Sequence, residues 1–182
     1  MVESERLILR NWKDSDQPVF AQMNTDPKVM EFLPKSFWGN DGKEVIARIK
    51  NSIETNGYGM WAMERKDTGE FIGFTGLHSP TWEAHFTPCI EVGWRLASKY
   101  WGQGFATEGA LASLDYGFNK MNLDEIVSFT VPDNTRSRKV MDRIGMTYDK
   151  SGDFNHPTLP ENDPLSQHVL YRLSKKDYIG HS

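Results

Sequence analysis

Between residues 90 and 108, a predicted strand runs through a glycine-containing loop directly into a predicted helix. Apolar residues alternate along 90–96, and Gly102 and Gly104 stand just before the helical pattern begins. A helix that starts after such a loop directs its free backbone N–H groups and the positive end of its dipole at one place. The stretch therefore predicts an anion site, typically for phosphate, because no side chain at Gly102 or Gly104 holds a diphosphate away from the amides.

Two other phosphate-binding loops do not match these residues. The dinucleotide fingerprint Gly-x-Gly-x-x-Gly needs a small third residue where Thr107 stands, and an acidic residue at the end of the next strand, which is not clear here. The nucleoside triphosphate loop needs Gly-Lys-Ser or Gly-Lys-Thr, and neither occurs in the sequence. Binding of a nucleotide or another phosphate by this loop is therefore the least favoured hypothesis.

Strands and helices alternate along the rest of the chain. Alternating apolar residues predict strands over 7–12, 58–66, 71–77, 90–96, 126–131 and 167–173. Helical spacing predicts helices that include residues 17–23, 45–56, 104–118 and 134–144. This order indicates an α/β or α+β protein with a mixed sheet. No repeat or linker divides the 182 residues, so we expect one domain over 1–182.

Composition excludes several other classes of protein. The chain has 21 Lys and Arg against 25 Asp and Glu, a net charge of −4, whereas a nucleic-acid-binding surface needs clustered cations. No stretch reaches the about 18 apolar residues of a membrane span, and the N-terminus lacks an export signal, so we expect a cytoplasmic protein with no membrane partner. The one cysteine, Cys89, excludes an internal disulfide, and no zinc-ligand spacing occurs, so we expect no metal.

Taken together, these features resemble the GNAT N-acetyltransferases, most closely the subgroup that includes the RimJ/RimL-type ribosomal-protein N-terminal acetyltransferases. The resemblance covers nearly the whole chain, and the order of its segments makes it specific. The segments are Ser4-Glu5-Arg6-Leu7-Ile8-Leu9-Arg10, Phe71-Ile72-Gly73, Glu91-Val92-Gly93-Trp94-Arg95-Leu96, Tyr100-Trp101-Gly102-Gln103-Gly104-Phe105-Ala106-Thr107-Glu108, Asn134-Thr135-Arg136-Ser137 and Ile144-Gly145-Met146.

The resemblance implies the GNAT fold, which is a mixed, mostly antiparallel sheet of six to seven strands, splayed at the cofactor site, with helices on both faces. It also implies acetyl-CoA as cosubstrate and CoA as product. The family's diphosphate loop, Gln/Arg-x-x-Gly-x-Gly/Ala, corresponds to 99–104, where Lys99 is a departure that keeps a positive charge. The residues implied in cofactor binding are Val92, Trp94, Arg95, Leu96, Lys99, Trp101, Gly102, Gln103, Gly104, Phe105, Ala106, Thr107, Asn134 and Ser137.

Family position makes Glu91 the candidate general base. On the residues alone, a strand carboxylate is more often solvated or ion-paired. Beside a splayed cofactor strand, however, it can take a proton from an attacking ammonium, directly or through water. His85 or His168 would be the substitute base. Direct transfer is favoured over an acyl-enzyme at Cys89, because no His–carboxylate partnership for that thiol is visible in the sequence.

Ser137 is the second candidate catalytic residue. Asn134 and Ser137 suit the first turn of a helix, and helical spacing places Ser137 on one face with Val140 and Met141, towards the cofactor sulfur. Many family members have, one turn later, a Tyr that protonates the leaving thiolate, but Met141 occupies that position here. This departure motivates the alternative of a non-catalytic CoA-binding or sensing module with the same fold.

The sequence leaves the amine acceptor open. A protein N-terminus, a free amino acid, a polyamine and an amine-bearing antibiotic are all compatible with it, and the net charge of −4 favours a cationic one. Trp38 and Trp82 lie in predicted loops, where large aromatic residues often line a pocket. Residues 149–166 are expected to form an ordered wall on the substrate side. Both a monomer and a homodimer are compatible with the sequence.

Overall fold

One eight-stranded sheet runs through the part of the chain that the computed structural model describes, residues 1–34 and 42–178. Its strand order is β1-β2-β3-β4-β5-β6-β8-β7, and all neighbouring strands are antiparallel except the parallel pair β5 and β6. The strands are β1 (Val2–Glu3), β2 (Leu7–Arg10), β3 (Met60–Arg65), β4 (Phe71–His78), β5 (Glu91–Leu96), β6 (Glu125–Thr130), β7 (Thr147–Asn155) and β8 (Gln167–Ser174).

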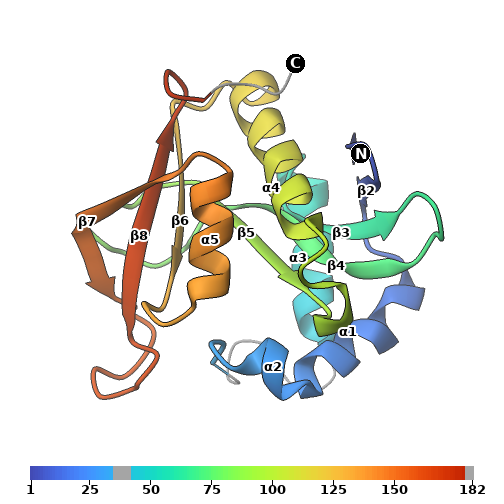
Figure 1. The fold of residues 1–182 in the computed structure, drawn as a ribbon, viewed down its shortest axis with the longest axis horizontal. Coiled ribbons are helices and arrows are strands. Elements are labelled where there is room, and N and C mark those ends of the chain that lie inside the picture. Colours follow the sequence, from blue (N-terminus) through green and yellow to red (C-terminus); the bar gives the residue numbers. More distant parts are fainter. Residues whose placement is uncertain (35–41, 179–182) are drawn as a thin grey trace.

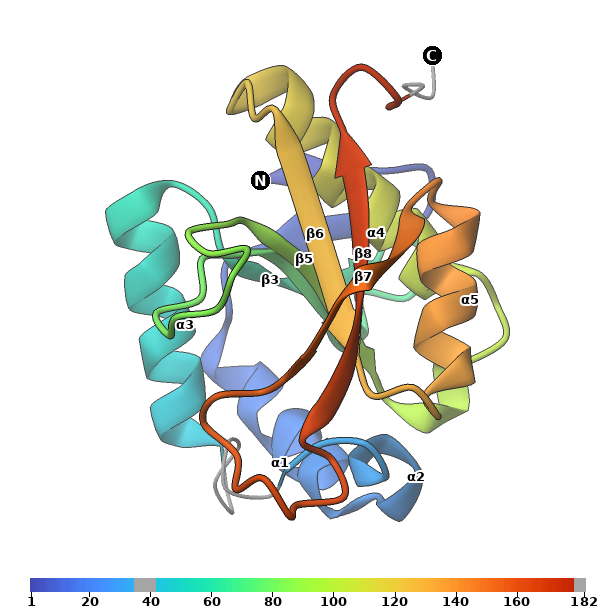
Figure 2. The ribbon, with the colours of Figure 1, turned by 90° about the vertical axis from the view of Figure 1, so that its left-hand side faces the viewer.

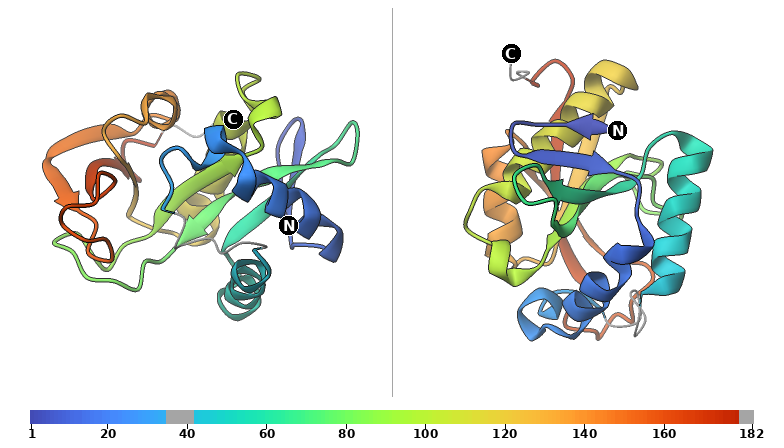
Figure 3. Two further views of the ribbon diagram at one scale, coloured as in Figure 1. Left: turned by 90° about the horizontal axis from the view of Figure 1, so that it is seen from below. Right: turned by 90° about the vertical axis from the view of Figure 1, so that its right-hand side faces the viewer.

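Helices cover both faces of this sheet, with α4 and α5 on one face and α3 on the other (Figures 1 and 3). The helices are α1 (Gln17–Thr25), α2 (Pro27–Met30), α3 (Lys43–Asn56), α4 (Phe105–Asp115) and α5 (Thr135–Arg143). Short 3-10 turns cover Asp14–Asp16 and Ser98–Tyr100, and one π-helical turn, Tyr116–Lys120, follows α4. None of the helices in the described ranges has the length and apolar character needed to span a bilayer.

The predicted fold class is confirmed, whereas the predicted six to seven strands are too few. The sequence pattern did not reveal β1, which has only two residues, or β7, which overlaps the segment 149–166 that is expected only to form an ordered wall. β7 is the edge strand, and its register with β8 shifts between Asp149 and Phe154. Polar residues are tolerated at such an edge and an irregular register breaks their alternation, which explains why the pattern was weak.

β5 and β6 diverge soon after they meet (Figures 1 and 2). Glu91 and Val127 form the one register pair between them, whereas β5 and β4 share six pairs. The amide of Val127 donates to the carbonyl of Ile90 at 2.9 Å, and the Ser128 hydroxyl donates to the carbonyl of Val92 at 2.9 Å. Beyond these contacts no strand among the described residues pairs with this edge of β5, so a gap opens in the middle of the sheet.

Two apolar cores pack against the sheet in the described part of the chain. The first packs the predicted apolar face of α3, including Ile46 and Ile53, together with Trp12 and Phe74. The second packs α4 and α5 against β4, β5, β6 and β8. Because the second core contains side chains from strands on both sides of the gap, it joins the two halves of the sheet where β5 and β6 part.

The start of α4 is held by residues from the N-terminal strands. Glu108 accepts hydrogen bonds from the Ser4 hydroxyl (2.7 Å), the Arg6 amide (2.7 Å) and Arg6 Nε (2.6 Å). Arg6 also donates to the carbonyl of Gln103 at 3.0 Å and lies over the ring of Phe105. These contacts explain why Ser4-Glu5-Arg6 and the segment ending at Glu108 occur together in one sequence, since the first positions the second.

Replacing Glu108 by Gln is expected to lower the free energy of unfolding at pH 7 by about 1 to 3 kcal/mol, because hydrogen bonds to a charged acceptor are lost. Burial opposes ionisation of Glu108, but the bonds from Ser4 and Arg6 hold its pKa below the usual range. The stabilisation is therefore present above the pKa of the unfolded chain and is lost as pH falls through the lower folded pKa. Urea unfolding at pH 7 and pH 3 should show a larger deficit at pH 7 than at pH 3, and the exposed helix-start variant Glu44→Gln should show little at either pH. A deficit of equal size at both pH values would contradict the charged clamp.

Candidate active site

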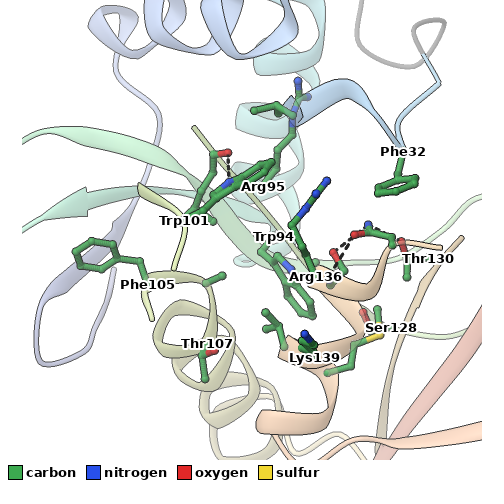
Figure 4. A pocket seen from close by; sticks show the side chains of 18 of the residues that line it. Phe32, Trp94, Arg95, Trp101, Phe105, Thr107, Ser128, Thr130, Arg136 and Lys139 are labelled. Carbon is green, nitrogen blue, oxygen red and sulfur yellow. Dashed lines mark hydrogen bonds between the residues drawn. The ribbon is translucent and has the colours of Figure 1, made fainter. Parts of the chain in front are cut away.

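A pocket of about 500 Å³ opens where β5 and β6 part (Figure 4). Its walls come from α2 and the residues after it, β5, residues 100–107, the end of β6, and α5. This volume is typical of a site for a small molecule or cofactor. The predicted site residues that line the pocket are Glu91, Trp94, Arg95, Leu96, Trp101, Gly102, Gly104, Phe105, Ala106, Thr107, Asn134 and Ser137.

Three predicted cofactor residues, Val92, Lys99 and Gln103, do not line this pocket. The Val92 side chain is buried in the core between the sheet and α4. Lys99 Nζ lies 4.7 Å from the ring centre of Tyr100 and lines a separate groove. The Gln103 side chain donates to the carbonyl of Lys99 at 3.1 Å. The charge of Lys99 is thus directed away from the pocket.

The side chain of Arg95 is also directed away from the splayed edge. It is buried, donates to Asn24 Oδ1, and stacks over the ring of Phe20. Burial lowers the pKa of Arg95 to about 10. Arg95 therefore anchors β5 to α1. A cofactor at the open edge of β5 would contact the backbone of the strand and not the guanidinium of Arg95.

The glycine loop has the geometry that anion binding requires. Gly102 and Gly104 adopt left-handed backbone angles, with φ of 76° and 83°. Gly104 is the N-cap of α4 and provides no side-chain cap, so the amides of residues 105–107 have no partner within the helix. A Cβ built at Gly102 would have no heavy atom of residues 1–34 or 42–178 within 4 Å. Free amides beside open space at a helix N-terminus suit a diphosphate.

Apart from Arg95, the cationic side chains that line the pocket come from α2 and α5 and not from the glycine loop. Lys28, Arg136, Lys139 and Arg143 all line it. The last three recur on one side of α5 at intervals of three and four residues, a periodicity that could have indicated them from the sequence but was not among its predictions. These cations and the loop amides fit a cofactor that carries several phosphates.

Arg136 connects the two sides of the pocket mouth (Figure 4). Its guanidinium lies 4.8 Å from the ring centre of Trp101 and 5.5 Å from that of Phe32, and it forms an ion pair with Glu31. The indole of Trp101 also donates to the carbonyl of Leu96 at 2.9 Å. This chain of contacts joins the end of β5, the glycine loop, α5 and the segment after α2 around one opening.

Glu91 lies at the point where the strands separate. Its register partners Val127 on β6 and His78 on β4 place its side chain on the face opposite α4 and α5. The side chain is half-buried, and no hydrogen bond or ion pair reaches its carboxylate from the part of the chain that the structure describes. Burial raises the pKa of Glu91 to about 8. A carboxyl group with this pKa can accept and release a proton near neutral pH.

Asn134 and Ser137 form a hydrogen-bonded group at the start of α5. The Asn134 side chain accepts from the Ser137 amide at 3.3 Å and donates to Ser137 Oγ at 3.1 Å and to Thr130 Oγ1 at 2.9 Å. Because Ser137 Oγ accepts from Asn134, its own proton is free for another partner. Met141 is buried and lines the same pocket, in the place where the family pattern has Tyr.

The substitute bases and the thiol lie outside this pocket. His85 is exposed, whereas His168 packs among aromatic rings and burial lowers its pKa. Burial and then the charge of Glu91 raise the pKa of Cys89 to about 11, so the thiol is protonated near neutral pH. Trp82 belongs to the same group of rings as His168, and Trp38 lies outside the described residues. In the described ranges, no group of three or more His, Cys, Asp or Glu side chains could hold a metal ion.

Comparison with known proteins agrees with this geometry. Residues 6–147 match the acetyltransferase (GNAT) domain family. Over 149 residues, 81% of this chain and 86% of the relative, the sequence is 32% identical to the uncharacterized protein YkkB of Bacillus subtilis (strain 168). It is 26% identical over 179 residues, 97% of each chain, to the uncharacterized N-acetyltransferase p20 of Bacillus licheniformis. The crystal structure of an acetyltransferase from Agrobacterium tumefaciens (strain C58) superposes with a TM-score of 0.75 at 29% identity, over 94% of this chain and 92% of that one.

This chain therefore belongs to the GNAT acetyltransferase family. It is an acetyl-CoA-dependent N-acetyltransferase, with acetyl-CoA as cosubstrate and an amine as acceptor. The glycine loop, the cations of the pocket and the gap between β5 and β6 are the features of this chain that fit that cosubstrate.

Proposed function

We propose that the chain transfers the acetyl group directly from acetyl-CoA to a primary amine while both are bound. The observation that carries this proposal is the position of Glu91, at the separation of β5 and β6 and on the face opposite α4 and α5. The cosubstrate would enter from the side of the glycine loop and α5. The amine would approach from the opposite face, where Glu91 can take its proton.

The residues that would hold acetyl-CoA follow from the pocket. The amides of residues 102–107 would bind the diphosphate, and Arg136 and Lys139 would neutralise phosphate charge. The open backbone of β5 near Trp94 would bind the pantetheine arm as an added strand, with Asn134 beside it. The carbonyl of Leu96 already accepts from Trp101, so the other polar groups of this edge would make the contacts.

In the reaction, Glu91 accepts a proton from the ammonium, directly or through water, and the neutral nitrogen attacks the thioester carbonyl. Backbone N–H groups near 92–94 stabilise the negative charge on the carbonyl oxygen. The C–N bond forms, the nitrogen releases its second proton to water, and the C–S bond breaks so that the thiolate leaves beside Ser137. The Ser137 hydroxyl donates a hydrogen bond to this sulfur. It thereby stabilises the thiolate that a Tyr protonates in many relatives.

Initial-rate kinetics test direct transfer. With both substrates varied, double-reciprocal lines should converge, and Cys89→Ser should change kcat less than about twofold, because a protonated thiol with a pKa of about 11 is a poor nucleophile. Parallel lines, an acetyl group covalently attached to Cys89, and loss of activity in Cys89→Ser would together establish an acyl-enzyme instead.

The subgroup and the acceptor belong to this proposal as well. A RimJ/RimL-like enzyme acting on a protein N-terminus or a small-molecule amine is consistent with the fold of two solved neighbours. These are the ribosomal-protein-S5-alanine acetyltransferase of Vibrio fischeri (22% identity, TM-score 0.73) and a spermidine N-acetyltransferase of Vibrio cholerae with CoA and spermine (18% identity, TM-score 0.73). Their acceptors differ although their fold is shared, so the acceptor here has to be inferred from this chain's own residues. The single domain over 1–182, the cytoplasmic location, the monomer or homodimer and the lack of a nucleic-acid partner stay predictions.

A further inference from the structure

A group of aromatic rings lies outside the two cores described above. The rings come from the loop between β4 and β5, from β6, and from the β7–β8 hairpin. Trp82 stacks on Phe154 with ring centres 5.8 Å apart, and lies 5.5 Å from Phe129 and 4.8 Å from His156. This aromatic wall consists of Trp82, Phe86, Phe129, Phe154, His156 and His168. All of its rings are half-buried except the buried His156, so part of their surface stays open.

The aromatic wall begins beside the proposed point of transfer. Phe129 belongs both to the wall and to the lining of the cofactor pocket. Because Glu91 pairs with Val127, and Phe129 follows Val127 by two residues, Glu91 and Phe129 lie on the same face of the sheet. The pairing of Phe129 with Leu170 places His168 on that face too. An amine at Glu91 would therefore have the aromatic wall as its neighbour.

The segments that carry the aromatic wall are acidic, whereas the cofactor pocket is lined by cations. The two segments that carry most of the wall, 79–91 and 151–168, contain no Lys or Arg, and their acidic residues are Glu83, Glu91, Asp153, Glu161 and Asp163. Burial and the neighbouring His168 lower the pKa of His156 to about 4, so this ring is neutral near pH 7. On the same face, α3 contributes the cation Arg48 near His78. Arg172 is another cation on this face, since it pairs in register with Val127, and it forms ion pairs with Glu125 and Asp149. A carboxylate on the acceptor would meet acidic groups, whereas an ammonium would be attracted.

We propose that the aromatic wall binds the body of the acceptor, and that the acceptor is a primary arylalkylamine without a carboxylate. The flat ring of such an amine would pack against Trp82 and Phe129 while its nitrogen lies at Glu91. This proposal rests on the transferase function above and makes it specific. It accounts for features that acetyl-CoA alone does not require, namely the partly open rings and the lack of cations in both segments.

A panel of amines at saturating acetyl-CoA, with CoA release as readout, tests the class of acceptor. Phenethylamine and tryptamine should have kcat/KM values at least about tenfold above those of phenylalanine and tryptophan, which add a carboxylate to the same rings, and above that of spermidine, which has no ring. Preferred turnover of spermidine, of an amino acid or of an alanine-starting peptide would overturn the acceptor class and leave the transferase function standing. If no amine of the panel led to release of CoA, both the acceptor class and the transferase function would be overturned.

Variants of Trp82 test the wall itself. Trp82→Ala should raise KM for phenethylamine at least about fivefold and leave KM for acetyl-CoA unchanged, while Trp82→Phe, which keeps a ring, should recover most of the loss. A second variant, Phe154→Leu, should act in the same direction, and thermal melting should confirm that each variant is folded. Unchanged KM for phenethylamine in both folded variants would show that the rings only support the loop, and would overturn the proposal.

Discussion

Replacing Glu91 by Gln is expected to lower kcat/KM by about 10²- to 10⁴-fold, the range that one general base supplies. Burial raises the pKa of Glu91 to about 8. In the native enzyme the rate should therefore rise with pH through about 8, because only the ionised carboxylate accepts the proton. Glu91→Gln should lose this inflection, and pH–rate profiles from pH 6 to 10 measure both effects.

Two controls separate this loss from misfolding or a general change of charge. Glu54→Gln removes one acidic group from the exposed side of α3 and should keep the native rate and profile. A raised folded pKa means that Glu91 favours folding least at high pH, so Glu91→Gln should be at least as stable as the native chain at pH 9. A profile that keeps its inflection near pH 8 in Glu91→Gln would exclude Glu91 as the base.

Gly104→Glu is expected to weaken acetyl-CoA binding by at least about 100-fold. Gly104 has a φ of 83° and its Cβ would lie 3.3 Å from the Arg6 guanidinium, at the N-terminus of α4. A carboxylate there competes with the diphosphate for the amides of residues 105–107 and repels it at short range. Thermal shifts of the native chain with acetyl-CoA should be large, and those of Gly104→Glu small, because stabilisation of the folded state rises with the logarithm of ligand concentration over Kd.

The matched control is Gly57→Glu, which adds the same side chain at a similar φ of 77°. Gly57 ends α3, has no heavy atom within 4 Å of its Cβ and does not line the pocket. This variant should have the same strain and charge as Gly104→Glu but should bind acetyl-CoA normally. Shifts with ATP or NAD as large as those with acetyl-CoA would contradict a CoA-specific loop, and normal binding by Gly104→Glu would exclude the loop as the diphosphate site.

The local elements could be predicted from the sequence because each has its own pattern. The glycines at 102 and 104, the Asn134 cap and the apolar face of α3 act within a few residues, and the structure has each where the pattern placed it. The strand β7 could not be predicted, since an edge strand with a shifted register does not alternate.

Contacts between distant segments were harder to predict than the elements themselves. The direction of Lys99 depends on Tyr100 and the neighbouring groove, and Arg136 reaches the pocket because Trp101 and Phe32 lie beside it. Those contacts depend on how α2 and α5 pack, which no local pattern specifies. Sequence position indicated Glu91, but its raised pKa follows from burial that only the folded chain provides.

The most direct test of the account is to identify the product by mass spectrometry. Purified protein, acetyl-CoA and phenethylamine should yield one N-acetylated amine for each CoA released, at a rate far above the reaction without enzyme, and Gly104→Glu should yield almost none. Bound acetyl-CoA with no acetylated product from this amine, from spermidine or from an alanine-starting peptide would contradict the account, and would indicate a CoA-binding module that has lost transfer.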